Sequence, residues 1–325
     1  MIRYIFRRIM MMVPVLLGVV LITFTMMYLS PGDPARFVLG DMATPEDIAI
    51  FNEQNGLNEP FIAQFGRYVK NALAGDLGIS YTTKQPVIDE VLGRLPTTFK
   101  LTVVSIAIAV ILGVALGVIS AVKQYGIVDN VTRVVAMLGV SMPAFWEGLM
   151  LMILFSVVLG ILPPSGLATW KHWVMPSITL STGTLSACMR MTRSSMLEEI
   201  RQDYVRTARA KGQNEFVVIM KHAFRNAVLP IITVVGGDFA RLMGGVAVVE
   251  IVFSIPGVGK LIVDGISVKN APLVQGGILL IAVTMSFINL LTDILYAFVD
   301  PRIRSQYMGA KRFDRKKVKE VADIG

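Results

Sequence analysis

Long uncharged stretches dominate this sequence and limit what it can fold into. A bilayer core about 30 Å thick is crossed by about 20 apolar residues in a helix, because every backbone polar group must be paired where water is absent. The chain contains six segments of this kind, at residues 9–29, 101–122, 134–164, 172–189, 226–253 and 271–299. We therefore predict an all-α membrane protein with six transmembrane helices.

The composition agrees with this prediction. The chain has 325 residues, of which 54% are hydrophobic and 17% charged, whereas soluble domains carry about 25% charged residues. The net charge of +8 lies in blocks between apolar segments, which indicates membrane orientation and argues against a nucleic-acid partner. One cysteine and two histidines leave little material for a disulfide framework, a zinc site or an iron–sulfur cluster, so we expect no cofactor in this chain.

The basic residues also predict the orientation, since Lys and Arg near the ends of spans stay on the cytoplasmic side. They gather at 3–8, 123–133, 190–225 and 302–319. Both termini are then expected in the cytoplasm, which agrees with an even number of spans. The first span is too long for the apolar region of a signal peptide, and no small-residue cleavage site follows it, so we expect a retained anchor.

A long polar loop, residues 30–96, is expected outside the membrane and folded in water. Thr44 and Pro45, followed by acidic residues, are typical of a helix start, and this helix is expected to end at Asn55. A second helix is expected from Pro60, with an apolar stripe at four-residue spacing made by Phe61, Phe65, Val69 and Leu73. The loop either covers the membrane helices or docks an external partner.

Small side chains recur every four residues in two of the predicted spans. In the second span they are Ser105, Ala109, Gly113, Gly117 and Ala121, and in the fifth span they are Gly236, Ala240 and Gly244. Such ridges allow helix backbones to approach closely in a membrane, so we predict tight helix packing, within the chain or with a second subunit. The fourth span is rich in hydroxyl groups, and we favour water lining over buried packing for it.

Four charged residues lie at apparent membrane depth, namely Glu147, Asp238, Arg241 and Glu250. A charge there costs at least about 2.5–3.5 kcal/mol, so each needs a partner or water. Asp238 and Arg241 are three residues apart and can neutralise each other on one helix face. Glu147 follows Pro143, where a kink could put it in a cavity or near an interface. All four are candidate pathway residues, with a structural ion pair as an equally supported role for Asp238 and Arg241.

The sequence offers no catalytic pattern in the predicted spans. His172 and His222 both fall outside mid-membrane positions, which disfavours an intramembrane hydrolase. Segment 256–260 has a likeness to a phosphate-binding loop, but Ser254 stands where the first glycine belongs and Leu261 where the hydroxyl belongs, and the segment is expected on the outer side. We predict a non-catalytic chain; if ATP drives transport, another subunit binds it.

The cytoplasmic loop 196–230 is expected to form two short helices. An apolar stripe on the first is made by Leu197, Ile200, Tyr204 and Ala208. Gly212 is expected to end this helix in the left-handed conformation, and Asn214 to cap the next one. Such a pair of helices could be a peripheral lid or a knob for a partner's groove.

The same loop carries a family resemblance. Residues 204–212 read Tyr-Val-Arg-Thr-Ala-Arg-Ala-Lys-Gly, and residues 222–230 read His-Ala-Phe-Arg-Asn-Ala-Val-Leu-Pro. This resembles the EAA loop of ABC importer permeases, in the variant of the dipeptide/oligopeptide/nickel family. Arg206 stands where the general pattern has glutamate, and Thr207 where it has alanine. Further landmarks similar to that family lie at 3–8, 31–34, 75–78, 94–98, 141–146, 253–257 and 300–304.

What the resemblance implies is the first (B-type) permease subunit, with the type I ABC importer permease fold, forming half of a translocation pathway for short peptides. It implies a homologous second permease as heterodimer partner, two ATPase subunits that bind ATP and Mg, and an extracytoplasmic substrate-binding protein at the cell membrane. Coupling to the ATPase would involve Tyr204, Arg206, Thr207, Ala208 and Gly212. Glu147 departs from the family, which has an apolar residue there.

The implied organisation has four parts: an N-terminal segment and anchor (1–29), an extracytoplasmic loop domain (30–96), a transmembrane core (97–299) with the coupling loop 196–230, and a basic cytoplasmic tail (300–325). Uptake of a nickel chelate is the alternative within the same family. From another class, a self-sufficient secondary transporter would use Asp238, Arg241 and Glu250 as its ion path. A purely structural scaffold is the weakest reading, because polar residues at membrane depth are costly to keep.

Overall fold

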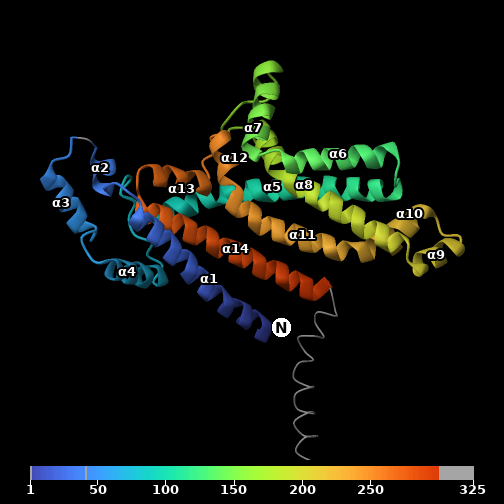
Figure 1. The fold of residues 1–325 in the computed structure, drawn as a ribbon, viewed down its shortest axis with the longest axis horizontal. Helices are drawn as coiled ribbons and strands as arrows, with labels where there is room; N and C mark the ends of the chain where they lie inside the picture. Colours follow the sequence, from blue (N-terminus) through green and yellow to red (C-terminus); the bar gives the residue numbers. More distant parts are fainter. Residues whose placement is uncertain (1, 41, 300–325) are drawn as a thin grey trace, which may run out of the picture.

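The computed structural model describes residues 2–40 and 42–299, and the predicted tail 300–325 lies outside the described residues. The regular secondary structure of the described part is helical, apart from one isolated antiparallel bridge between Ile79 and Pro86. It is elongated, with α2, α3 and α4 at one end and α9 and α10 at the opposite end (Figure 1).

The described helices are, in chain order, α1 (Ile2–Leu29), α2 (Pro34–Leu39), α3 (Pro45–Gln54), α4 (Phe61–Leu73), α5 (Val87–Val122), α6 (Ile127–Ser141), α7 (Ala144–Met152), η1 (Ile153–Val158), α8 (Lys171–Ile200), α9 (Asp203–Ala210), α10 (Glu215–Val217), η2 (Val218–Ala223), α11 (Phe224–Gly245), α12 (Ala247–Val252), α13 (Val258–Ser267) and α14 (Ala271–Val299). Both η elements are π-helical. No helix break separates loop and core at residue 96, because α5 runs through it.

Four segments of the described chain are long and apolar enough to cross a membrane, namely Ile5–Leu29, Val87–Val122, Glu215–Gly245 and Ala271–Ile294. A bent pair of helices makes a fifth candidate. The fourth span expected from the sequence, 172–189, lies in α8, which has 30 residues but is too polar to meet the same criterion. The fold is therefore that of an all-α membrane protein with four or five apolar spans and one long polar helix packed among them.

The third expected span, 134–164, is wrong as one continuous segment. Ile127–Ser141 and Ala144–Val158 meet at an angle of 106°. Met142 is extended at the break, as expected for a residue that precedes proline, and Pro143 precedes the first turn of α7. In consequence α7 turns away from the bundle that contains α5, α6 and α8 (Figure 1).

The small-residue ridge on α5 packs against α8 of the same chain, so the prediction of close packing is confirmed. All five ridge residues are buried. A Cβ added at Gly113 would lie 2.9 Å from the carbonyl oxygen of Leu185, and one added at Gly117 would lie 2.7 Å from that of Met189. Backbone atoms of the two helices are thus in contact wherever these glycines occur.

The shorter ridge on α11 packs against α14. A Cβ at Gly236 would lie 2.1 Å from Cγ2 of Thr292, and one at Gly244 would lie 3.5 Å from Met285. Ala240 is 4% exposed and packs in a cluster with Met243 and Ile288. Both ridges therefore hold this chain's own helices together.

Most hydroxyl groups of α8 are buried within this chain, which argues against the expected water lining, and Thr182 is the one residue of the predicted polar set that is only partly buried. Six of its polar residues, Ser177, Thr179, Ser181, Thr184, Ser186 and Cys188, are at most 3% exposed. Thr179 and Ser181 donate hydrogen bonds to carbonyl oxygens of their own helix. The polarity of α8 thus comes from its position between α5, α6 and α11, where small polar side chains permit close packing.

The outer loop contains the two helices predicted from its sequence, preceded by the short α2. At α3, the Thr44 hydroxyl and the Asp47 carboxylate form reciprocal hydrogen bonds with backbone N–H groups. The Thr44 hydroxyl also donates to the Asp47 carboxylate, and this bond, followed by the one from the Thr44 N–H, holds the pKa of Asp47 below its usual value. The predicted stripe on α4 is partly wrong, because Leu73 is 83% exposed. Four-residue spacing drifts around a helix of 3.6 residues per turn, so the face that starts with Phe61 and Phe65 continues through Tyr68 and Ala72.

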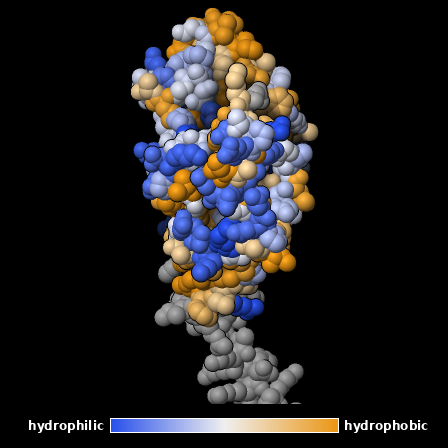
Figure 2. Space-filling model, turned by 90° about the vertical axis from the view of Figure 1, so that its left-hand side faces the viewer, coloured by the Kyte–Doolittle hydropathy of each residue, from blue (hydrophilic) through white to orange (hydrophobic). Residues whose placement is uncertain are grey.

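This loop packs on the end of α1. The rings of Phe61 and Phe65 lie 5.3 Å and 5.4 Å from the ring of Phe24, both at steep interplanar angles. Figure 2 views this end of the molecule and shows hydrophilic residues over much of the middle of the face. A cavity of about 680 Å³ opens between the end of α1, the helices α3 and α4, and the segment 269–275. The surface fits a domain that folds in water.

Candidate functional site

The loop between α8 and α11 forms a compact turn at one end of the bundle. Gly212 has φ +72° and follows α9, as the sequence predicts, because glycine enters the left-handed region without a Cβ penalty. The side chain of Asn214 accepts a hydrogen bond from the N–H of Phe216, at 2.9 Å, and so caps α10. The second predicted helix does not end near Pro230; α10 continues through η2 into α11 without interruption.

A small apolar core fixes this loop to the membrane helices. It joins Met196 of α8, Val205 and Ala208 of α9, Val218 of η2 and Ala121 of α5, together with Ile219, Ala223 and Ala227. Val205 is completely buried, although the stripe read from the sequence passed through Tyr204 instead. Of the candidate coupling residues, Ala208 thus contacts this chain's own core and is 5% exposed.

Tyr204 ties α9 to the helices on both sides. Its hydroxyl donates to a carboxylate oxygen of Glu199 in α8 and accepts a hydrogen bond from Asn226 Nδ2 in α11, at 2.9 Å. Burial, and after it the hydrogen bond to Glu199, raises the pKa of Tyr204. Tyr204 is therefore a positioning residue for α9, and the sequence alone gave no sign of its two partners.

The outer face of α9 is polar and exposed. The side chains of Arg206 and Asp203 are 72% and 98% exposed and lie 3.8 Å apart. The Thr207 hydroxyl donates to the carbonyl oxygen of Asp203 within the helix. Arg209 forms a bidentate pair with Glu215 across the Gly212 turn, and this hydrogen bonding raises the pKa of the guanidinium. The loop thus presents a rigid helix whose polar side is free of intrachain packing.

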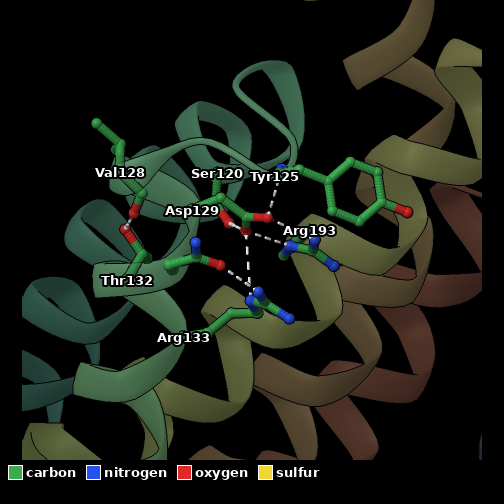
Figure 3. A network of polar contacts seen from close by, with 8 residues as sticks. Ser120, Tyr125, Val128, Asp129, Thr132, Arg133 and Arg193 are labelled. Atoms are coloured by element: carbon green, nitrogen blue, oxygen red, sulfur yellow. Dashed lines mark hydrogen bonds and ion pairs between the residues drawn. The ribbon is translucent and has the colours of Figure 1, made fainter.

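A buried carboxylate links α8 to the α5–α6 turn, and sequence reasoning missed it (Figure 3). Asp129 is 0% exposed. It accepts hydrogen bonds from Ser120 Oγ at 2.5 Å, from Tyr125 N at 3.0 Å, and from Arg193 Nε and Nη2 at 2.7 Å and 2.9 Å. Arg133 Nε lies 3.8 Å away. We call Asp129 and Arg193 with these neighbours the α6–α8 clamp.

Glu147, in the first turn of α7, lies against α8. It is 9% exposed, and its Oε1 accepts a hydrogen bond from Thr182 Oγ1 at 2.5 Å. Among the described residues no Lys or Arg forms an ion pair with it. Its carboxylate is thus a nearly buried negative charge with one neutral donor.

Asp238 and Arg241 form the ion pair that the sequence predicted, with Arg241 Nε 3.0 Å from Asp238 Oδ1. The two side chains differ in exposure, since Asp238 is 15% and Arg241 63% exposed. Oδ2 of Asp238 is buried and receives no hydrogen bond from the described residues. The guanidinium of Arg241 thus stays mostly exposed although it is paired with Asp238.

Glu250 is enclosed by its own chain and serves as a cap. It is 0% exposed, and its carboxylate accepts hydrogen bonds from Thr98 Oγ1 at 2.6 Å and from the N–H of Lys260 at 2.9 Å. Thr98 in turn accepts from the N–H of Val258. The first turn of α13 is therefore capped by Glu250 through the N–H of Lys260 and by Thr98 through the N–H of Val258, and a carboxylate is favoured at this end of a helix. A Cβ at Gly257 would lie 1.9 Å from Glu250 Oε1, so this contact requires glycine there.

The described residues contain no group of three or more His, Cys, Asp or Glu side chains arranged to hold a metal ion. The four acidic or basic candidates at membrane depth are also distributed over three elements, α7, α11 and α12. The structure brings Asp238 and Arg241 together but leaves Glu147 and Glu250 with separate partners.

Two family models match this chain. The model described as "Binding-protein-dependent transport system inner membrane component" matches residues 113–305, and the model described as "Binding-prot-dependent transport system membrane comp, N-term" matches residues 1–102. Together they cover most of the sequence.

Curated relatives match over nearly their whole length. The chain is 40% identical over 332 residues to the dipeptide transport system permease protein DppB of Alkalihalophilus pseudofirmus, covering 94% of this chain and 100% of that protein. It is 43% identical over 304 residues to the glutathione transport system permease protein GsiC of Pectobacterium atrosepticum, covering 94% and 99%. Among solved structures, a chain of the inward-facing MetNI methionine ABC transporter aligns with TM-score 0.54 at 17% identity, covering 65% of this chain and 96% of that chain, which is a likeness of fold.

Proposed function

Since the chain belongs to the family of binding-protein-dependent transport system inner membrane components, we propose that it forms half of the translocation pathway of an ATP-driven importer for short peptides. It is a non-catalytic, multi-pass inner membrane permease subunit of an ABC transporter, and it works with ATPase subunits and a binding protein. Nucleotide and its metal are bound by the ATPase partners. The names of the relatives, one a dipeptide permease and the other a glutathione permease, support a peptide as the substrate.

We further propose six crossings, with α8 as the polar one and both termini in the cytoplasm. The 30 residues of α8 give it a length of about 45 Å, enough to cross the bilayer, and its neighbours bury its hydroxyl groups. In this topology the domain 30–96 is extracytoplasmic, 97–299 is the transmembrane core of the type I fold, and 300–325 is a cytoplasmic tail. The other half of the pathway comes from a homologous permease in a heterodimer.

The loop 196–230 is proposed as the element that couples this subunit to an ATPase. The observation that carries this proposal is the two-sided character of α9, which is fixed to the bundle by Val205, Ala208 and Tyr204 and exposes Arg206 and Thr207 on the other side. A helix fixed in this way moves as a rigid body with α8 and α11, so that a displacement by the ATPase is transmitted to the spans.

Replacing Gly212 with valine is expected to uncouple ATP hydrolysis from uptake. No atom lies within 4 Å of a Cβ at this position, so the change tests backbone conformation and not packing. A β-branched residue at φ +72° costs on the order of 1–3 kcal/mol and displaces α9 from the turn. In proteoliposomes with the complete transporter, peptide uptake per ATP hydrolysed is expected to fall at least about fivefold.

The matched control is Gly212→Asn, because asparagine tolerates the left-handed region. This variant is expected to keep most of the wild-type ratio of uptake to hydrolysis. If the valine variant kept that ratio as well, the turn would have no part in coupling.

The pathway role is proposed for Glu147 together with Arg241, because Glu250 is used as a cap. Glu147→Gln retains the hydrogen bond from Thr182 but removes the charge. We expect uptake of a peptide with a basic side chain to fall roughly tenfold, about 1.4 kcal/mol, because a carboxylate with few neighbours in a low dielectric interacts strongly with a cation. Uptake of a neutral peptide of the same length is expected to change little, and an equal loss for both peptides would exclude a role in charge selection.

Reconstitution tests the function as a whole. The chain is purified with its homologous permease, the ATPase subunits and the binding protein, and uptake of labelled di- and tripeptides is measured with and without ATP. ATP-dependent peptide uptake supports the proposal. Uptake of a nickel chelate without uptake of peptides would show that the chelate is the substrate. Gradient-driven flux through this chain without an ATPase would identify a secondary transporter instead.

A further inference from the structure

An apolar groove of about 630 Å³ lies between α5 and the first half of α11. One wall extends from Val110 to Ile119 of α5, and the other from Met220 of η2 to Val235 of α11. Every residue that lines it is apolar. It is separate from the α5 ridge that packs on α8, since the ridge residues do not line it. A hollow of this composition in a membrane protein is suited to a hydrocarbon chain.

The groove has the length of one leaflet. The wall on α5 covers ten residues, which at 1.5 Å per residue is about 15 Å. The hydrocarbon core of a bilayer is about 30 Å thick, so the groove spans about half of it. It lies in the half of the bundle that ends at α9 and α10, because it is lined by the last turns of α5 and the first turns of α11.

Three cations lie where the groove reaches that end. Lys123 is the C-cap of α5, and its backbone N–H donates to the carbonyl oxygen of Ile119, a residue that lines the groove. Lys221 and Arg225 each directly follow a residue that lines the groove, Met220 and Phe224. All three cations are exposed. Within the described part of the chain, none of them forms an ion pair with an acidic side chain.

We propose that this groove is a binding site for an anionic phospholipid of the cytoplasmic leaflet. An acyl chain occupies the apolar hollow, and the phosphate group lies at the rim near Lys221, Arg225 and Lys123. Basic residues next to apolar grooves on the cytoplasmic side attract anionic lipid by about 1 kcal/mol, or about fivefold in affinity, for each Lys or Arg. A transmembrane helix of a partner subunit is the other occupant that an apolar groove fits, and the three exposed cations at one end favour the lipid over it.

The bound lipid would link moving parts of the subunit. It contacts α5 on one side and η2 with α11 on the other, directly beside the apolar core that holds α9. Met220 lies in the π-helical η2, so the lipid would also contact this element, and π-helical turns are frequent at functional sites. The inference is independent of which substrate the transporter carries.

The test is retention of lipid by the assembled transporter. The complete complex is reconstituted in nanodiscs of phosphatidylcholine with a minor share of phosphatidylglycerol, extracted gently and examined by native mass spectrometry. We expect wild type to retain phosphatidylglycerol in preference to phosphatidylcholine. In Lys221→Gln/Arg225→Gln, the ratio of retained phosphatidylglycerol to retained phosphatidylcholine is expected to fall at least about tenfold. A second variant, Ala115→Phe, fills the groove from an exposed position without touching the cations and is expected to lower retention of both lipids at this site.

Matched controls separate the site from general effects. Arg190→Gln/Arg201→Gln removes two exposed charges away from the groove, and Ala107→Phe adds a ring at an exposed position of α5 outside it. Both controls are expected to behave as wild type. The proposal is overturned if the control pair lowers the preference for phosphatidylglycerol as much as the groove pair does. It is also overturned if wild type retains no phosphatidylglycerol and a cysteine placed in the groove cross-links to the partner permease, because a protein helix then occupies the groove.

Discussion

Asp129→Ala is expected to lower the free energy of unfolding of the transporter by about 3 kcal/mol and to remove most of its ATP-driven uptake. The side chain receives four hydrogen bonds and is completely buried, while Arg193 keeps 21% of its side chain exposed. Removal of one member of a buried ion pair costs about 3–5 kcal/mol, and the partial exposure of Arg193 puts the value at the lower end. Tyr125, held at φ +63°, also loses the acceptor of its N–H.

The loss of uptake follows from the position of the α6–α8 clamp. Arg193 lies in the last part of α8, which leads directly into α9, and Asp129 lies in the first turn of α6. The clamp therefore connects loop 196–230, which we propose as the coupling loop, to the segment that bends at Pro143 and contains Glu147 in its second half. When it is broken, movement of α9 is no longer passed on to α6, so hydrolysis is expected to continue while uptake falls.

A double-mutant cycle checks this prediction. Stability of the purified complex is measured for Asp129→Ala, Arg193→Ala and the double variant, and we expect an interaction energy of about 2–3 kcal/mol. Glu59 and Arg67 serve as the control pair, because they are 2.6 Å apart but both 43% exposed; their interaction energy is expected to stay below about 1 kcal/mol. Additive losses at Asp129 and Arg193 would show that they do not act as a unit.

Local features of this fold could be predicted from the sequence because their causes are local. The Thr44 cap, the end of α3 and the Gly212 turn with its Asn214 cap all depend on residues within a few positions of one another. The small-residue ridges were also predictable, since a four-residue period is visible in the chain and its physical use in membranes is general. The partner of each ridge was not, because any helix can supply one.

The features that sequence reasoning missed depend on contacts between distant segments. Asp129 and Arg193 are separated by 64 residues, and in the sequence each looks like an ordinary charged residue at the end of a span. Glu250 looked like a pathway carboxylate, since nothing in the sequence shows that the chain reverses at Pro256 and brings the start of α13 to it. The polarity of α8 suggested water for the same reason, because burial between three helices is a property of the assembled bundle.

Gly117→Ala is expected to destabilise this chain at the contact between α5 and α8. Its new Cβ would lie 2.6 Å from Cβ of Thr192 and 2.7 Å from the carbonyl oxygen of Met189. A backbone atom cannot move aside without separating α5 from α8, so overpacking of about 1–3 kcal/mol is expected. Since α5 and α8 also support the clamp through Ser120 and Arg193, the melting temperature and the yield of assembled complex should both fall.

Gly183→Ala is the matched control, because it adds the same methyl group to α8 at a position with no atom within 4 Å. Alanine is favoured over glycine inside a helix by roughly 0.5–1 kcal/mol, so this variant is expected to be neutral or slightly more stable. The two substitutions have the same helix propensity term and differ only in what the methyl group meets. Their difference in melting temperature therefore measures the close contact alone, and equal behaviour of the two variants would show that α5 and α8 do not pack backbone to backbone in the membrane.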